Sequence, residues 1–253
     1  MSIAVITGAS SGIGKEMAKI LSHKGYSLIL VARNKILLDE LSATLPTKTK
    51  TLSLDLSKKA NIFKLLKYIK KKKIDIFINN AGFGDVGDFD KTSLSKELDM
   101  IDVNIKALHI LTKAALKIMK RRNYGYILNV ASSAGLFYAG PYMATYYASK
   151  AYVTSLTTAI SSELKASKSN VSISALCPGP VNTNFNNVAN VKFALNGISA
   201  RECAKVAIDG MFKKKLIIIP TIYMKLAVFG NKLLPRQLSA RIVGKQQSKK
   251  IYN

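Results

Sequence analysis

The stretch IAVITGASSGIG, residues Ile3–Gly14, decides the fold of this 253-residue chain. An apolar run of strand length passes directly into a glycine-rich turn, and the residues after the turn repeat apolar side chains at helical spacing. A helix that begins at such a turn offers its first N–H groups to a phosphate, because they have no partner inside the helix. Gly8 permits the tight turn, Gly12 lets the backbone approach the phosphate, and Gly14 lets helix and strand pack closely. We therefore expect a pyrophosphate site lined by Gly8, Ser10, Ser11, Gly12, Ile13 and Gly14.

Outward from this unit, short apolar runs alternate with amphipathic helical patterns. In the helical patterns apolar residues share one face, as Ile62, Leu65 and Ile69 do, while lysines occupy the other. Continuous apolar strands are typical of a parallel sheet covered on both faces. We therefore predict an α/β fold, a single Rossmann-like doubly wound parallel sheet with helices on both faces, forming one domain over residues 1–253. The predicted strands are 3–7, 27–32, 51–54, 75–79, 126–131, 171–176 and 216–219.

The composition restricts the classes of partner. The formal net charge of +25 favours anionic partners such as phosphorylated cofactors, acyl thioesters, anionic lipid or nucleic acid. Lysines spread over most helices are also typical of ordinary solvent-facing surfaces. Nothing in the sequence resembles a nucleic-acid recognition module, so we expect no specific nucleic-acid partner. Two isolated cysteines and two histidines give neither a disulfide framework nor metal-ligand spacing, so we expect no metal.

The ends of the chain bear on its location. The first strand-like run begins at Ile3, and no stretch is apolar for long enough to span a bilayer, so we expect a cytoplasmic protein. The segment at about 221–253 is basic and amphipathic, with Leu226, Phe229 and Leu233 at helical spacing and no acidic residue after Asp209. Such a segment is compatible with contact with an anionic membrane, and also with packing on the body of the protein or on a partner subunit.

Two motifs carry a resemblance to a known family. The spacing Gly-x-x-x-Gly-x-Gly within Thr7–Gly14 resembles the fingerprint of the short-chain dehydrogenase/reductase superfamily, and Asn79–Gly82 resembles its second motif. The resemblance runs from Ile3 to about Pro220 and implies an oxidoreductase that moves a hydride between a nicotinamide cofactor and a carbonyl or alcohol. It also implies a homodimer or homotetramer. Contacts with the adenosine half of the cofactor are implied for Asp55, Asn80 and Gly82.

Arg33 bears on the choice between the two nicotinamide cofactors. It follows the second predicted strand, where an NAD-binding domain usually carries an acid that holds the ribose 2′-hydroxyl. An arginine suits a 2′-phosphate instead, and no acidic residue lies between Glu16 and Asp39. We therefore predict NADP(H). The prediction depends mainly on Arg33, because Ser11 stands where many NADP-preferring relatives carry Arg or Lys; a solvated arginine in a loop is the alternative.

Tyr146 and Lys150 form the predicted catalytic pair. Their i, i+4 spacing places a phenol and an ammonium on one helix face. A free phenol has a pKa of about 10, and we expect the ammonium and an oxidised nicotinamide to favour the phenolate. The neighbouring Tyr147 is followed four residues later by Ala151, so it lacks the lysine that the chemistry needs.

The resemblance adds two catalytic residues. Ser133 lies thirteen residues before Tyr146, the usual separation in the family, and is expected to hydrogen-bond the substrate oxygen. The adjacent Ser132 is the alternative, and it points to the opposite side if the strand continues. Asn104 resembles the family's fourth catalytic residue, which holds a water in a proton relay from Lys150 at a local break in a helix.

The last motif follows the sixth predicted strand and resembles the family's Pro-Gly motif. It implies contacts with the nicotinamide carboxamide for Pro178, Gly179, Val181 and Thr183. Residues 184–198 are expected to form a lid, and its apolar residues favour an acyl chain, a steroid-like ring system or an aromatic ketone as substrate. A loop packed on itself accounts for them equally well. The apolar lid residues are Phe185, Val188, Val191, Phe193 and Leu195.

A non-catalytic NADP(H)-binding sensor or scaffold is the alternative function. The presence of the complete catalytic set, Asn104, Ser133, Tyr146 and Lys150, counts against this alternative.

Overall fold

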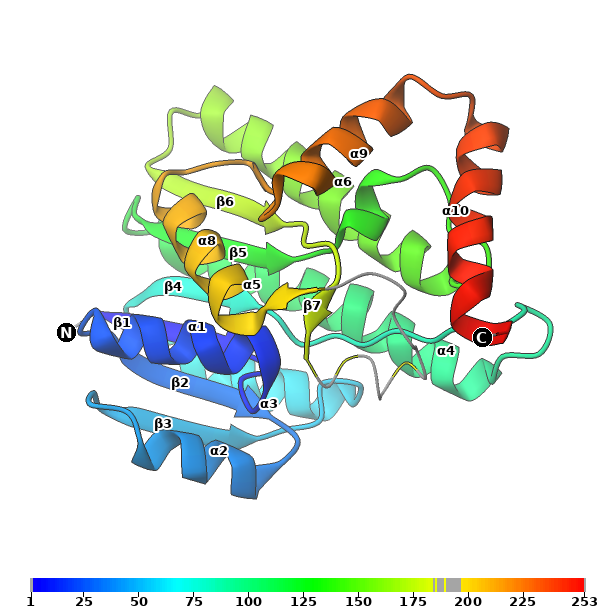
Figure 1. Ribbon diagram of the computed structural model, residues 1–253. Coiled ribbons are helices and arrows are strands. Elements are labelled where there is room, and N and C mark those ends of the chain that lie inside the picture. Colours follow the sequence, from blue (N-terminus) through cyan, green and yellow to red (C-terminus); the bar gives the residue numbers. More distant parts are fainter. Residues whose placement is uncertain (1, 184, 186–188, 190–196, 253) are drawn as a thin grey trace.

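The computed structural model describes residues 2–183, 185, 189 and 197–252 (Figure 1). Seven strands form one parallel sheet in the order β3-β2-β1-β4-β5-β6-β9. The predicted α/β class and each predicted strand are confirmed, with boundaries that differ by one or two residues. The strands are β1 Ile3–Thr7, β2 Ser27–Ala32, β3 Thr49–Ser53, β4 Ile74–Asn79, β5 Gly125–Val130, β6 Val171–Leu176 and β9 Ile217–Ile218. Two short parallel strands, β7 (Val181–Asn182) and β8 (Ile198–Ser199), pair outside this sheet.

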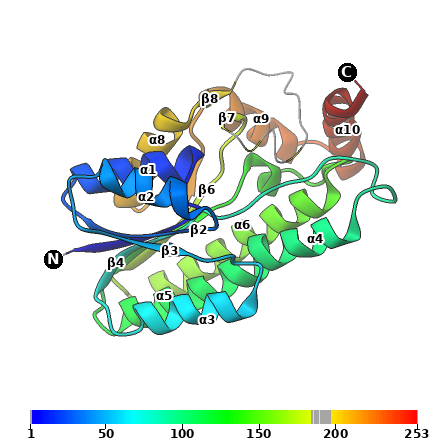
Figure 2. The ribbon, with the colours of Figure 1, turned by 90° about the horizontal axis from the view of Figure 1, so that it is seen from below.

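Helices cover both faces of the sheet (Figure 2). One face carries α1 (Gly12–His23), α2 (Lys35–Ala43) and α8 (Ala200–Phe212). The other carries α3 (Lys59–Ile69), α5 (Leu108–Lys120) and α6 (Ala144–Ala166). The remaining helices are α4 (Leu94–Ile101), α9 (Ile222–Lys232), α10 (Arg236–Tyr252), a π-helical segment η1 (Asp102–Ala107) and a 3₁₀ turn η2 (Ser133–Leu136). Within the described part of the chain, no helix is both long and apolar enough to cross a membrane.

Strand β1 shows how the sequence produces two cores. Successive side chains of a strand point to opposite faces of the sheet. Ile6 packs in a cluster that includes Met17 of α1, whereas Val5 packs in a second cluster with Ile62 of α3 and Leu111 of α5. All five side chains are buried, at 0–1% exposure. Because both faces must be apolar, the strand is a continuous hydrophobic run rather than an alternating one.

The strand order locates the site. The chain winds outward from β1 through β2 to β3, and then restarts on the other side of β1 with β4. In an open α/β sheet ligands bind outside the carboxyl ends of the strands at this reversal. Figure 1 shows all large strands ending on the side where α10 lies, so the loops after β1, β4, β5 and β6 converge there.

Candidate active site

A cavity of about 900 Å³ lies along the carboxyl ends of the strands. Its volume is at the upper end of the range for small-molecule sites. Loops after six strands, β1 to β6, line it, together with α6, α9 and α10. The predicted site residues that line it are Gly8, Ser10, Ser11, Gly12, Ile13, Arg33, Asp55, Asn80, Gly82, Ser133, Tyr146, Lys150, Pro178, Gly179, Val181 and Thr183. Gly14 and Asn104 are not part of this lining.

The glycine-rich turn has no room for side chains. Gly8 and Gly12 have φ of +63° and +53°, in the left-handed region that favours glycine. A Cβ on Gly14 would lie 2.3 Å from the carbonyl oxygen of Gly8, so this glycine permits the contact between helix and turn that the sequence predicts. The amide of Asn80 donates to the carbonyls of Thr7 (3.0 Å) and Gly8 (2.9 Å) and holds the turn against the end of β4.

The start of α1 fits a pyrophosphate. Ser11 is the N-cap, and its side chain makes no hydrogen bond to the first turn in the described structure. The first N–H groups of α1 are therefore available to an anion, next to a turn whose glycines allow close approach of the backbone. Thr183 reaches the same turn from the loop after β6, because its Cγ2 would lie 3.1 Å from a Cβ on Gly12. The two loops together form a cradle that fits a dinucleotide.

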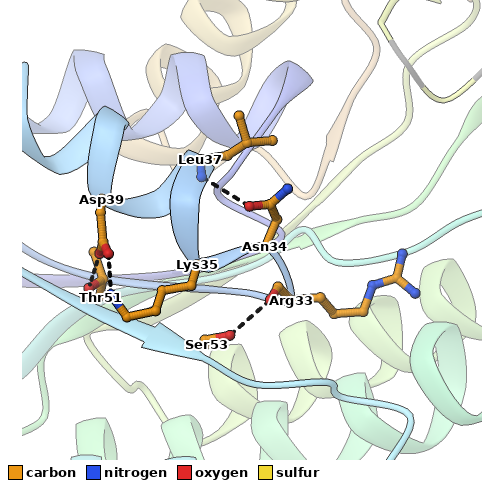
Figure 3. A network of polar contacts seen from close by, with 7 residues as sticks. All are labelled: Arg33, Asn34, Lys35, Leu37, Asp39, Thr51 and Ser53. Carbon is orange, nitrogen blue, oxygen red and sulfur yellow. Dashed lines mark hydrogen bonds and ion pairs between the residues drawn. The ribbon is translucent and has the colours of Figure 1, made fainter.

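Arg33 lies at the far arm of the cavity, directly after β2. Its carbonyl oxygen accepts a hydrogen bond of 2.8 Å from the Ser53 hydroxyl. Figure 3 shows its side chain extending away from the ion pair between Lys35 and Asp39. Asp39 also accepts a hydrogen bond from the Thr51 hydroxyl (2.9 Å), so its two carboxylate oxygens are bound to Lys35 and Thr51 rather than to Arg33. Among the described residues, the Arg33 guanidinium has neither a hydrogen bond nor an ion pair within 4 Å.

Asp55 lines the same arm, directly after β3. Burial pushes its pKa up, but hydrogen bonds from Ser57 and the positive charges of Arg33 and Lys58 outweigh burial and hold the pKa below its ordinary value. The Ser57 N–H lies 3.0 Å from Asp55 Oδ1. Asp55 is therefore an ionised acceptor whose pKa is lowered in part by the positive charge of Arg33.

Tyr146 and Lys150 lie together on the first half of α6. Both are buried, with exposed fractions of 9% and 4%. The Lys150 Nζ lies 5.7 Å from the centre of the Tyr146 ring and donates a 3.0 Å hydrogen bond to the carbonyl oxygen of Val130. The i, i+4 spacing thus places the phenol and the ammonium at one cavity, as the sequence predicts.

The protein alone raises the pKa of this phenol, whereas the sequence-based expectation concerned the site with an oxidised nicotinamide bound. Burial raises the pKa of Tyr146 to about 12, although a hydrogen bond with the Ser132 side chain opposes the shift. Burial also lowers the pKa of Lys150 to about 8. Desolvation disfavours the charged form of each group and is the largest cause of both pKa shifts. In the protein alone, the phenol is therefore protonated at neutral pH.

Two serines compete for the role of binding the substrate oxygen, and the spacing favours Ser133. Of the two, Ser132 is the one whose side chain acts on the pKa of Tyr146 through hydrogen bonding. The argument about opposite sides requires the strand to continue, but β5 ends at Val130 and the chain turns into η2 at Ser133. Ser132 is the N-cap of η2, where its hydroxyl accepts from the Ala134 N–H (3.2 Å). Both serines line the cavity.

Asn104 lies in a helix break of the expected kind, the π-helical segment η1 between α4 and α5. The side chain is fully buried and fully engaged. Its amide donates to the Phe83 carbonyl (2.9 Å) and the Ser149 hydroxyl (3.1 Å), and its oxygen accepts from the Phe83 N–H (3.1 Å). A Cβ on Gly82 would lie 2.9 Å from the Asn104 oxygen and 3.2 Å from the Lys150 Nζ. Asn104 therefore fixes the loop after β4 beside the catalytic lysine.

The predicted lid is described only in part. Val188, Val191, Phe193 and Leu195 lie outside the described residues. Phe185 lines the cavity, and the centre of its ring is 5.6 Å from that of Tyr146. This contact provides an apolar surface next to the catalytic phenol.

A family model of short chain dehydrogenases matches residues 2–192. The chain belongs to the short-chain dehydrogenase family. It is an oxidoreductase of this family, acting on CH–OH or C=O groups, with the family's nucleotide-binding Rossmann fold. The sequence-based identification is thereby confirmed.

Individual relatives agree with this assignment. An uncharacterized oxidoreductase of Staphylococcus epidermidis is 38% identical over 184 residues, which cover 72% of this chain and 78% of the relative. A very-long-chain 3-oxoacyl-CoA reductase of Pyrenophora tritici-repentis is 40% identical over 172 residues, which cover 64% of this chain and 50% of the reductase. The structure of a short-chain dehydrogenase from Sphingobium yanoikuyae in complex with NADPH is similar, with a TM-score of 0.82, 28% identity and coverage of 92% and 94%.

The sequence analysis missed the inner side of the C-terminal helices of this short-chain dehydrogenase. Met224, Asn231 and Val243 of α9 and α10 line the cavity, as does Gln247. The Gln247 amide donates a 2.8 Å hydrogen bond to the Tyr147 hydroxyl and ties α10 to α6. No motif marks these residues. The available signal is that α9 carries apolar residues on two sides, which indicates one buried face and one free face.

Proposed function

We propose that this short-chain dehydrogenase interconverts a carbonyl and an alcohol on an apolar small molecule, with NADP(H) as its cofactor. The observation that carries the proposal is that the buried Tyr146 and Lys150 line the same cavity as the glycine-rich turn and Arg33. One elongated site thus joins a phosphate cradle to an acid/base group, as a reaction between a dinucleotide and a second molecule requires.

Arg33 supports NADP(H) rather than NAD(H). Its guanidinium lines the cavity and has no close partner among the described residues, so it is free to take a 2′-phosphate. The related Sphingobium yanoikuyae protein binds NADPH. The cradle residues would hold the pyrophosphate, and Pro178, Gly179, Val181 and Thr183 would hold the nicotinamide end. When bound, the cofactor supplies or accepts the hydride.

The residues of the chain itself handle the proton. In the direction of reduction, Tyr146 donates its proton to the carbonyl oxygen, and its raised pKa ensures that it carries this proton at neutral pH. We assign the hydrogen bond to the same oxygen to Ser132, because both serines line the cavity and the side chain of Ser132 acts on the pKa of Tyr146. Lys150 stabilises the phenolate that remains, and Asn104 keeps the neighbouring loop in place and serves the proposed relay. In the direction of oxidation the phenol must first lose its proton, which burial opposes.

The cavity wall supports an apolar substrate. Phe185, Met143 and Met224 line it near the catalytic tyrosine. Among ketones, aldehydes, steroid-like molecules and 3-oxoacyl thioesters, we favour 3-oxoacyl thioesters, because a relative reduces a very-long-chain 3-oxoacyl-CoA and the net charge of +25 attracts a phosphorylated carrier.

The assembly and location of the protein are part of the same proposal. We infer that residues 1–253 form one domain and that the protein is a cytoplasmic homodimer or homotetramer. Apolar side chains on α4, including Leu94 and Leu98, are 69% and 52% exposed and favour an oligomer.

The test is the loss of NADPH absorbance, with NADH in parallel, over medium-chain aldehydes, ketones, oxo-steroids and 3-oxoacyl thioesters. Tyr146→Phe should abolish turnover while it leaves NADPH binding intact. Binding of NADPH without turnover of any carbonyl would instead favour a sensor or scaffold. Failure to bind either cofactor would contradict the proposal.

A further inference from the structure

Helix α9 has an apolar face that no described residue covers. Ile222, Leu226, Phe229 and the C-cap Leu233 recur at the i, i+4, i+7, i+11 spacing of a single helix face. Their exposed fractions lie between 65% and 73%. Single exposed apolar residues are ordinary, but four on one face of one helix form a continuous stripe of the kind found at interaction surfaces.

The opposite face of α9 forms a wall of the cavity. Met224 and Asn231, which line the cavity, are 8% and 5% exposed. The end of the helix is held in place, because the Tyr138 hydroxyl donates to the Lys232 carbonyl (3.3 Å) and the Arg236 guanidinium lies 5.6 Å from the centre of the Tyr138 ring. The apolar stripe is therefore a fixed outer surface of the site.

The charges around the stripe identify its occupant. Lys225, Lys232 and Arg236 are exposed beside it, and no acidic residue follows Asp209. A second copy docked on this stripe would bring two such basic rims into contact, which electrostatic repulsion opposes. An anionic bilayer complements both features, because its headgroups attract the basic rim and its acyl region accepts the stripe. The basic residues after Asp209 are Lys213, Lys214, Lys215, Lys225, Lys232, Arg236, Arg241, Lys245, Lys249 and Lys250.

We propose that α9 docks this protein on an anionic lipid bilayer, with Ile222, Leu226, Phe229 and Leu233 at the boundary between headgroups and acyl chains. Docking in this orientation places the wall of the cavity against the lipid. An apolar substrate would then have a short path from the bilayer to Tyr146, a consequence that rests on the proposed function. The docking itself is independent of turnover.

The chain contains no tryptophan, which permits a direct test. Phe229→Trp would introduce a single fluorophore into the stripe, and Phe63→Trp, at a phenylalanine of α3 that is 50% exposed, is the matched control. The full chain is mixed with vesicles of phosphatidylcholine alone, or with roughly 30% phosphatidylserine, at ~0.1 M salt. We expect a blue shift and quenching by brominated acyl chains for Phe229→Trp on anionic vesicles only, and neither for Phe63→Trp.

Vesicle flotation provides the second measurement. Leu226→Gln with Phe229→Gln should weaken binding to the anionic vesicles at least about tenfold. The control pair Leu94→Gln and Leu98→Gln on α4 should leave binding unchanged. Three results would overturn the proposal: no binding of the wild type, equal binding of the α9 variant, or an α9 variant that changes only the oligomeric state in light scattering. None of these readouts requires a substrate, so their failure is distinct from failure of the proposed reaction.

Discussion

Replacing Arg33 with alanine tests the cofactor preference at the residue on which it depends. The guanidinium lies at the cavity and, among the described residues, has no close hydrogen-bond or ion-pair partner. Its removal should therefore cost no internal contact, and any loss of affinity should report the missing contact with the cofactor. We expect weaker binding of NADPH and little change for NADH, because only the former carries a 2′-phosphate.

The size of the effect follows from the exposure of Arg33. A hydrogen bond to a charged group contributes about 1.5–3 kcal/mol. Arg33 is exposed, so solvent and salt screen the interaction and the lower end of this range applies. About 1.5 kcal/mol corresponds to a roughly tenfold increase in the Kd for NADPH. The Kd for NADH should change less than about twofold.

Isothermal titration calorimetry with each cofactor, at low and moderate salt, measures both constants. Lys35→Ala is the matched control, because Lys35 is a nearby exposed cation that already pairs with Asp39 (Figure 3). Its loss should affect the two cofactors alike. An equal loss of NADPH and NADH affinity in Arg33→Ala would refute the assignment of the 2′-phosphate to Arg33. A selective loss of NADPH affinity in Lys35→Ala as large as that in Arg33→Ala would refute it as well.

Three further predictions test the site and its packing. In steady-state kinetics, Ser132→Ala should lower kcat/KM about 10²-fold, whereas Ser133→Ala should change it only a few-fold. A larger loss in Ser133→Ala than in Ser132→Ala would instead favour Ser133 as the residue that binds the substrate oxygen. Lys150→Met should abolish turnover and raise the unfolding free energy at about pH 7 by about 1–3 kcal/mol, because the buried ammonium has its pKa lowered to about 8. Because the pKa of Lys150 is lower in the folded than in the unfolded wild type, the wild type loses stability as the pH falls from about 10.5 to about 8. The stability advantage of Lys150→Met should therefore shrink as the pH rises through this range. A difference between the two proteins in urea unfolding that does not depend on pH would contradict this reasoning. Gly14→Ala should destabilise the fold by about 1–3 kcal/mol, because the added Cβ would clash with the backbone carbonyl of Gly8. The control Gly230→Ala, at a helical glycine with open space around it, should stabilise the fold by up to about 1 kcal/mol. Similar melting temperatures of the two variants would argue against the close packing of α1.

Local sequence patterns predicted the elements of this protein well. The strand, turn and helix of Ile3–Gly14 are contiguous, and their glycines are required by the conformation of the same few residues. The phenol and ammonium of Tyr146 and Lys150 share a helix face through the 3.6-residue repeat, whatever surrounds the helix. Strand pattern and alternation with helices then determined the parallel sheet, because continuous apolar runs must be covered on both faces.

The chemical state of the site was decided only by packing. The expected preference for the phenolate considered the charges of Lys150 and an oxidised nicotinamide, whereas burial in the protein alone raises the pKa of Tyr146 to about 12. The choice between Ser132 and Ser133 depended on where β5 ends, which spacing along the chain does not specify. Asn104 illustrates the same limit, because its partner Phe83 lies twenty-one residues away in another loop.

The sequence by itself determined the class of fold, the glycine-rich turn and the placement of Tyr146 and Lys150 on one helix face, since each depends on residues within a few positions of one another. Only the tertiary structure decided which serine faces Tyr146, how far burial shifts the pKa values, and that α9 and α10 enclose the cavity. Gln247 reaches Tyr147 across one hundred residues of sequence, and no local pattern encodes that contact. These properties depend on desolvation and on contacts between distant segments, which exist only once the chain has folded.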